Sequence, residues 1–284
     1  MPSGLSAEAI GTDLYLDLLK RVLCASVYPE SSWQVVTGER AGASGLAHRL
    51  RRWAVNACRR RGLMFVKPRP FDPSLRESGR DYPCFGYSMI GLRRMTQLQE
   101  CVEAVIGDDI PGDLIETGVW RGGAAILMRA VLRRYGVTDR TVWAADSFDG
   151  LPPPRAEVDR LDLSFDLSEW SYLKVSLESV RAAFESFGLL DDQVRFLKGW
   201  FKDTLATAPI ERLSVLRLDG DMYESTIDAI TPLYPKLSPG GFVIVDDYFG
   251  WPGCRRAVDE YRSKHGITAK LIDIDGAAAY WRVG

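Results

Sequence analysis

The amino-acid sequence predicts an α/β fold: a largely parallel sheet with an antiparallel last strand, preceded by a mostly helical N-terminal extension. From residue 111 onward, short apolar runs alternate with longer segments of helical periodicity, the pattern of a parallel sheet with crossover helices. At the end of the chain, residues 269–274 and 278–283 are two strand-like runs with no helix between them, which indicates a closing hairpin. We therefore divide the chain into an extension, residues 1–110, and a core domain, residues 111–284.

The extension contains one clear helix and one basic cluster. Residues 13–27 place apolar side chains at helical spacing, which predicts an amphipathic helix. A cluster of arginines surrounds Trp53: Arg49, Arg51, Arg52, Arg59, Arg60 and Arg61. Such a cluster could touch phosphates, but a solvated or oligomer-facing helix surface is the favoured interpretation. Pro68, Pro70 and Pro73 are expected to break any helix that follows.

The core elements follow one another in a regular order. Short apolar runs predict strands at residues 113–117, 141–145, 194–197, 213–218 and 242–245. Helical periodicity predicts helices at residues 122–135, 176–187, 223–234 and 255–264. A long insertion with a proline-rich start occupies residues 149–170. Five alternating units and a closing hairpin are typical of class I methyltransferases, whereas dehydrogenases close with a sixth parallel strand.

The first two strands of the core predict an adenosine pocket. The segment DLIETGVWRGG, residues 113–123, is a buried strand that reaches Glu116 and then a glycine turn. The second strand runs into AADSFDG, which places Asp146 at its tip. Glycines let the backbone approach a ligand, and a carboxylate at a strand end accepts ribose hydroxyls. The glycines do not follow G-x-G-x-x-G. An acid such as Glu116 would repel a pyrophosphate but can hold the cationic amino end of S-adenosylmethionine.

Four acids are expected at the carboxyl ends of two later strands. Asp219 follows the strand at 213–218, while Asp246 and Asp247 follow the strand at 242–245. If these strands are neighbours, the three carboxylates converge, and they repel one another unless they are protonated or bind a cation. Oxygen ligands without His or Cys suit Mg²⁺. Asp221 is then placed to take a proton from a hydroxyl bound there. The alternative is that these acids only cap the helices that follow.

Composition argues against several classes of function. The net charge of −2 and the isoelectric point of about 5.8 give no global electrostatic case for nucleic-acid binding. No window approaches the ~20 apolar residues of a membrane span, and the first residues lack the basic and apolar regions of a secretory signal. The five scattered cysteines fit a reducing compartment. We therefore expect a cytoplasmic protein that binds neither nucleic acid nor membrane.

The motifs of the core resemble the macrocin O-methyltransferase family, Mg²⁺-dependent enzymes that methylate sugar hydroxyls on natural products. The resemblance runs from about residue 13 to the end of the chain. It is carried by PGDLIETGVWRGG, ADSFDGLP, GWFKDTL, LRLDGDMYEST and SPGGFVIVDDY. The segment YSMIGLRRMTQL, residues 87–98, resembles the part of these enzymes that closes over the cofactor.

The resemblance implies a role for each matching residue. S-adenosylmethionine would be bound by Glu116 and Gly118 at its methionine end, by Asp146, Ser147 and Phe148 at the ribose, by Gly199 and Trp200 at the adenine, and by Met89 and Ile90 in the lid. Thr117, Arg121 and Gly122 of the same glycine turn are also expected to bind the cofactor. From the sequence alone, Trp200 could equally be a core aromatic, and apolar core packing is the favoured interpretation for Met89 and Ile90. Mg²⁺ would be bound by Asp219, Asp246 and Asp247. Asp221 would be the base, with Asp219 as the alternative because the two acids are so close.

The implied reaction is direct methyl transfer to a sugar hydroxyl of a glycosylated secondary metabolite. The insertion with its end at Tyr172, residues 149–172, carries Phe165, Trp170 and Tyr172 and could form an aromatic lid over a large aglycone. Methylation of a phenol or polyketide hydroxyl and a non-catalytic S-adenosylmethionine-binding role are the alternatives. Catechol-type enzymes share the metal triad but use a lysine just after it, where this chain has Met222 and Tyr223. The resemblance also implies a homodimer or larger even homo-oligomer.

Overall fold

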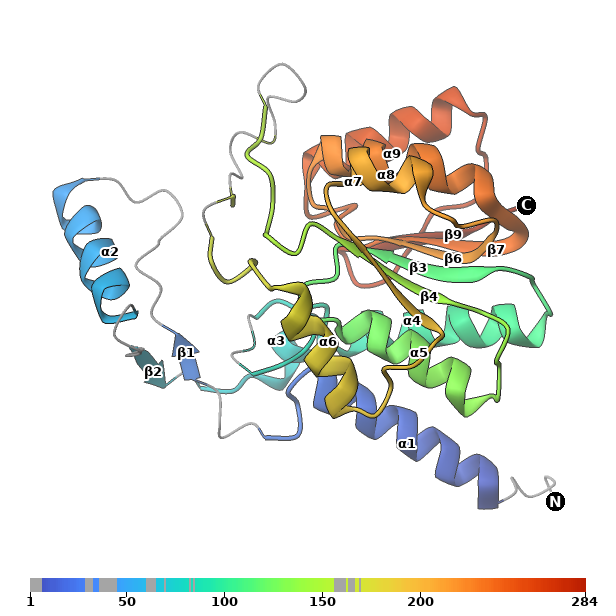
Figure 1. The fold of residues 1–284 in the computed structure, drawn as a ribbon, viewed down its shortest axis with the longest axis horizontal. Helices are drawn as coiled ribbons and strands as arrows, with labels where there is room; N and C mark the ends of the chain where they lie inside the picture. Colours follow the sequence, from blue (N-terminus) through green and yellow to red (C-terminus); the bar gives the residue numbers. More distant parts are fainter. Residues whose placement is uncertain are drawn as a thin grey trace.

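In the computed structural model, a seven-stranded sheet is covered by helices on both faces (Figure 1). The structure describes residues 7–28, 33–35, 45–59, 65–68, 70–81, 83, 85–155, 162, 167–168 and 170–284. Arg60, Arg61 and Phe165, which the sequence analysis singled out, lie outside this part of the chain. No helix in the described part is both long enough and apolar enough to cross a membrane.

The strand order of the main sheet is β5-β4-β3-β6-β7-β9-β8. The parallel strands are β3 (Asp113–Thr117), β4 (Val142–Asp146), β5 (Val194–Lys198), β6 (Leu213–Leu218) and β7 (Leu237–Val245). Strand β9 (Ala279–Arg282) lies antiparallel between β7 and β8 (Ile272–Asp273), which confirms the predicted closing hairpin. The strand order reverses between β3 and β6, so a ligand crevice is expected at the carboxyl ends of these two strands.

Both faces of the central parallel strands β3, β4 and β6 are buried, which explains their continuous apolar runs. Leu114 and Ile115 are neighbours in β3, yet they belong to two separate core clusters because side chains alternate across a strand. The first cluster packs against α1 (Ala7–Leu23), α4 (Gly91–Gly107), α5 (Gly123–Arg134) and α6 (Leu177–Ser186). The second packs against the helices α8 (Tyr223–Leu233) and α9 (Pro252–Lys264) on the opposite face of the sheet (Figure 1). A short helix α7 (Phe201–Thr204) and the 3-10 turns η3 (Leu205–Thr207) and η4 (Tyr234–Lys236) complete the helical elements of this region.

The extension shares the core of the sheet through α1 and α4. Between these helices lie α2 (Leu46–Arg59), the small antiparallel pair β1 (Trp33–Val35) and β2 (Val66–Pro68), and α3 (Pro73–Glu77). Four arginines of the cluster, Arg49, Arg51, Arg52 and Arg59, fall on α2, where Trp53 is 71% exposed.

One proline behaves differently from our expectation: Pro73 begins a helix where we predicted a break. Proline is tolerated in the first helical turn, where its missing N–H has no intrahelical partner to lose. The preceding residue, Asp72, caps this helix by accepting the Ser74 backbone N–H at 2.9 Å.

Candidate active site

A cavity of about 360 Å³ opens at the carboxyl ends of the parallel strands. Its wall combines residues predicted to bind the cofactor with two of the predicted acids: Met89, Gly118, Asp146, Ser147, Gly199, Trp200, Asp219 and Asp221. The other cofactor residues predicted from the sequence do not line this cavity in the structure: Glu116, Thr117, Arg121, Gly122, Phe148 and Ile90. The structure therefore brings predicted cofactor-binding residues and predicted acids together in one cavity. The remaining predicted cofactor-binding residues do not face it.

Gly118 allows the turn after β3 to touch the loop after β6. Its backbone φ is +90°, and a Cβ at this position would lie 1.7 Å from the backbone oxygen of Asp219. The N–H of Asp219 donates to the carbonyl of Thr117 at 2.9 Å, and the N–H of Gly118 donates to the carbonyl of Ala145 at 2.9 Å. Backbone contacts therefore set the position of the glycine turn relative to the acids.

The carboxylate of Asp146 connects two turns of the cavity wall through hydrogen bonds. Its carboxylate accepts the backbone N–H groups of Val119 and Phe148, each at 2.7 Å, and that of Trp120 at 3.3 Å. Burial raises the pKa of Asp146, and these three hydrogen bonds oppose the increase. The side chain thus orders the turns after β3 and β4, which both face the cavity.

Glu116 lies beneath the glycine turn. One carboxylate oxygen accepts the backbone N–H of Ala125 at 2.9 Å and the other accepts the guanidinium of Arg217 at 2.8 Å. Burial raises the pKa of Glu116 to about 8, although the charge of Arg217 opposes this. The contact with Ala125 joins Glu116 to the first turn of α5, so the acid holds this helix against the strand.

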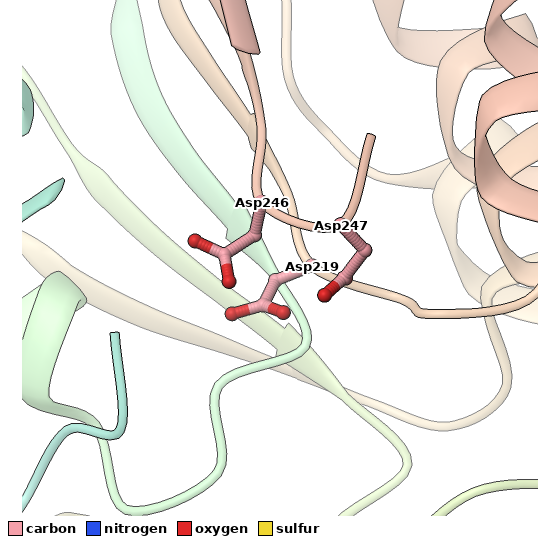
Figure 2. A group of neighbouring side chains, drawn as sticks. All are labelled: Asp219, Asp246 and Asp247. Atoms are coloured by element: carbon pink, nitrogen blue, oxygen red, sulfur yellow. The ribbon is translucent and has the colours of Figure 1, made fainter. Parts of the chain in front are cut away.

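Asp219, Asp246 and Asp247 form a cluster at the ends of β6 and β7. Each offers a carboxylate oxygen within 4.8 Å of the others, and Figure 2 shows the three side chains gathered together. Burial and the neighbouring Asp246 raise the pKa of Asp219 to about 6, and burial with repulsion from nearby acids raises that of Asp247. Three carboxylates whose oxygens lie so close together fit a hard divalent cation such as Mg²⁺, which prefers oxygen ligands.

Two buried arginines balance these acids, and sequence reasoning missed both. Arg217 of β6 is 1% exposed and donates to Asp219 at 2.6 Å and to Asp246 at 2.5 Å. Arg94 of α4 donates to the other oxygen of Asp246 at 2.5 Å. Arg217 had a visible signal in the sequence, because an arginine inside an apolar strand must find acids when it is buried.

Asp221 reaches the cavity from a left-handed backbone conformation, with φ of +58°. Aspartate adopts this conformation more readily than most residues. Burial raises the pKa of Asp221 to about 8, and the charges of Asp219, Asp246 and Asp162 add to the effect. Asp162 is a further buried acid that sequence reasoning missed; it accepts the backbone N–H of Tyr223 at 2.9 Å at the start of α8.

The described end of the insertion is attached to the turn after β3. The rings of Trp170 and Tyr172 stack at 5.2 Å, and Tyr172 lies 5.2 Å from the ring of Trp120. The indole N–H of Trp120 donates to the carbonyl of Tyr172 at 2.9 Å, while the Tyr172 hydroxyl donates to the carbonyl of Pro83 at 2.8 Å. Trp120 lines the cavity, so this aromatic group forms part of its wall.

Almost the whole chain matches one protein family. The family model described as macrocin-O-methyltransferase (TylF) matches residues 12–283. The chain belongs to this family. This identification confirms the resemblance stated above, and with it the assignment of the chain as an O-methyltransferase.

Several relatives of this O-methyltransferase are similar over nearly their whole length. Mycinamicin III 3''-O-methyltransferase of Micromonospora griseorubida is 46% identical over 279 residues, which cover 97% of this chain and 98% of that protein. The enzyme named 8-demethyl-8-(2,3-dimethoxy-alpha-L-rhamnosyl)-tetracenomycin-C 4'-O-methyltransferase, from Streptomyces olivaceus, is 49% identical over 271 residues, covering 95% of this chain and 92% of its own.

A solved structure confirms the fold of the enzyme. The O-methyltransferase NovP superposes with a TM-score of 0.81 at 46% identity, covering 96% of this chain and 99% of that chain. The predicted class I methyltransferase fold is therefore correct. The fold and the family are those of S-adenosylmethionine-dependent methyltransferases.

Proposed function

We propose that this enzyme transfers the methyl group of S-adenosylmethionine to a sugar hydroxyl of a glycosylated secondary metabolite, with Mg²⁺ bound by the acid cluster. The observation that carries the proposal is the single cavity that is lined by both the glycine turn and the acids Asp219 and Asp221. The Streptomyces olivaceus relative is named for a rhamnosyl-bearing substrate, which supports a glycoside acceptor for this chain as well.

In this proposal the cofactor contacts the predicted residues that line the cavity: Met89, Gly118, Asp146, Ser147, Gly199 and Trp200. The other predicted cofactor-binding residues do not line the cavity but support the residues that do. Glu116 bonds to the first turn of α5, and Arg121 donates to the carbonyl of Gly86 at 2.9 Å. Phe148 and Ile90 are buried in the core that supports the wall.

The protein has mainly to align the donor and the acceptor, because the methyl group of a sulfonium is already activated. Asp219, Asp246 and Asp247 would hold Mg²⁺, which lowers the pKa of a coordinated hydroxyl when it is bound. Asp221, on the cavity wall, would accept the hydroxyl proton. Asp219 is less suited to this role because one of its oxygens already accepts the Arg217 guanidinium at 2.6 Å.

Two further properties stay predictions. The chain is expected to form a homodimer or larger even homo-oligomer, which is supported by the exposed apolar side chains of Leu46, Leu50 and Trp53 on α2. The enzyme is expected to be cytoplasmic, in agreement with the free thiols of Cys24, Cys58, Cys101 and Cys254.

Replacing Asp146 by alanine is expected to weaken binding of S-adenosylhomocysteine by roughly 1.5–3 kcal/mol, the usual value for hydrogen bonds to a charged group. The change removes a carboxylate from the wall and also frees the Val119 and Phe148 amides that it holds. Isothermal titration calorimetry measures the loss. The matched control is Asp149→Ala, an exposed acid of the same motif, which should bind as tightly as the wild type. Equal affinity in both variants would contradict the placement of the ribose at Asp146.

The proposed reaction is tested by offering glycosides and their free aglycones to the enzyme with S-adenosylmethionine. Mass spectrometry should detect a gain of one methyl group on the glycosides alone, lost in excess chelator and restored by Mg²⁺. Methylation of the aglycones alone would assign the enzyme to phenol or polyketide hydroxyls. Full turnover in excess chelator would show that the acids serve only as structural caps.

A further inference from the structure

Arg94 joins the acid cluster to two other parts of the fold. It lies near the start of α4, is 8% exposed, and donates from Nη1 to Asp246 and from Nε to Asp275 at 2.8 Å. Asp275 belongs to the turn between β8 and β9. Its side chain is fully buried, and its second oxygen accepts the backbone N–H groups of Ala277 and Ala278, each at 3.1 Å. Arg94 therefore links the segment before the core, the acids and the closing hairpin.

Asp246 is held in one orientation from two sides. Its Oδ1 accepts Arg217 at 2.5 Å and its Oδ2 accepts Arg94 at 2.5 Å. Arg217 comes from the neighbouring strand of the sheet, so its position is fixed by the core. Arg94 comes instead from α4, and it holds Asp246 only when the start of that helix is in place.

The same short segment carries a residue of the cavity wall. Met89 lines the cavity and precedes Arg94 by five positions. Between them the chain is tightly packed: a Cβ on Gly79 would lie 2.5 Å from the backbone oxygen of Ile90. The N–H of Gly123, at the start of α5, donates to the carbonyl of Tyr87 at 2.9 Å. Met89 and Arg94 thus belong to one short segment whose backbone packs closely against Gly79 and is bonded to the start of α5.

We propose that Arg94 is a positioning residue that couples cofactor binding to metal binding. The inference rests on the proposed function, since it assumes that Met89 contacts the cofactor and that Asp246 binds Mg²⁺. A ligand that orders residues 87–94 through Met89 also orders Arg94 and therefore Asp246, so the second ligand binds to a site that is already arranged. Such coupling is reciprocal: each ligand raises the affinity of the other by the same factor.

The coupling factor is the ratio of the Mg²⁺ affinity with bound cofactor to the Mg²⁺ affinity without it. This ratio distinguishes a positioning role of Arg94 from a simple charge effect. Removing a positive charge beside the acids changes Mg²⁺ affinity whether or not the cofactor is bound, and it leaves the ratio of the two affinities unchanged. Loss of positioning lowers the ratio itself. Arg94→Lys keeps the charge but cannot bridge two carboxylates in the same way. Asp275→Asn leaves Arg94 and every proposed metal ligand intact and removes only the charge of the remote partner.

The test is calorimetric titration of Mg²⁺ into the full chain, with and without saturating S-adenosylhomocysteine. In the wild type we expect S-adenosylhomocysteine to tighten Mg²⁺ binding by about tenfold. In Arg94→Lys and in Asp275→Asn this factor should fall to about twofold or less. The matched control is Arg93→Lys. Arg93 is the neighbouring arginine, whose side chain is 55% exposed and pairs with Glu77 at 3.0 Å, and its variant should keep the wild-type factor.

The outcomes distinguish the two levels of the proposal. A wild type that binds no Mg²⁺ under either condition contradicts the metal part of the proposed function. A wild type that binds Mg²⁺ equally with and without S-adenosylhomocysteine overturns the coupling alone, as does an unchanged factor in the two variants. Thermal unfolding of each variant checks its folding. If Arg94→Lys does not fold, Asp275→Asn still decides the result.

Discussion

Replacing Asp221 by asparagine is expected to lower kcat by about 10²–10⁴, the usual contribution of a positioned general base. The amide has nearly the same shape as the carboxylate but cannot accept the acceptor's proton. Asparagine also tolerates the left-handed backbone that Asp221 adopts, with φ of +58°, so backbone strain should not confound the measurement. Steady-state kinetics at saturating Mg²⁺ and cofactor measure the loss, and calorimetry should show that S-adenosylhomocysteine still binds.

Asp203→Asn is the control for this prediction. Asp203 is an exposed acid of the neighbouring helix α7, and its variant should turn over at the wild-type rate. Full activity of Asp221→Asn, together with loss of activity in Asp219→Asn at saturating Mg²⁺, would transfer the role of base to Asp219.

Replacing Arg217 by methionine is expected to lower the free energy of unfolding by about 3–5 kcal/mol, the typical cost of removing one partner of a buried ion pair. Arg217 contacts Glu116, Asp219 and Asp246, of which Glu116 and Asp246 are buried with it. Methionine fills a similar volume but leaves these carboxylates without their shared cation. Denaturant unfolding monitored by circular dichroism, in the presence of chelator, measures the change.

Arg195 provides the comparison within the same sheet. It lies on β5 with an exposed side chain, so Arg195→Met should change the free energy of unfolding by less than about 0.5 kcal/mol. Equal unfolding midpoints for the two variants would show that Arg217 does not stabilise the fold through its ion pairs with the acids.

The strands of the core could be predicted because each one is a short apolar run bounded by polar residues. The bounds of β3 and β6 agree with the prediction at both ends. Strand β7 begins at Leu237, five residues earlier than expected, because the SPGG segment pairs irregularly with β6 instead of forming a separate turn. Glycine marks both turns and strand irregularities, so the sequence alone could not separate them.

The acids of the site could be predicted because carboxyl ends of neighbouring parallel strands meet at one edge of a sheet. The arginines that bind those acids could not be predicted from the sequence in the same way. Arg94 and Asp246 are separated by 152 positions, and no local sequence pattern links a helix to a strand end so far away in the chain. For Glu116 the sequence could predict its place at the end of β3 but not the direction of its side chain. The structure shows that this side chain bonds to the first turn of α5 and does not line the cavity.

The close approach of Gly118 to the carbonyl of Asp219 has a consequence for how such enzymes diversify. The two residues follow the adjacent strands β3 and β6, and adjacent strands lie about 4.8 Å apart, so the sheet itself sets the spacing between the glycine turn and the acids. Another part of the wall, including Leu151, Pro152 and Pro153, comes from the insertion after β4. The insertion can therefore change in sequence, and on the proposed function so can the choice of acceptor, while the spacing between the glycine turn and the acids stays constant.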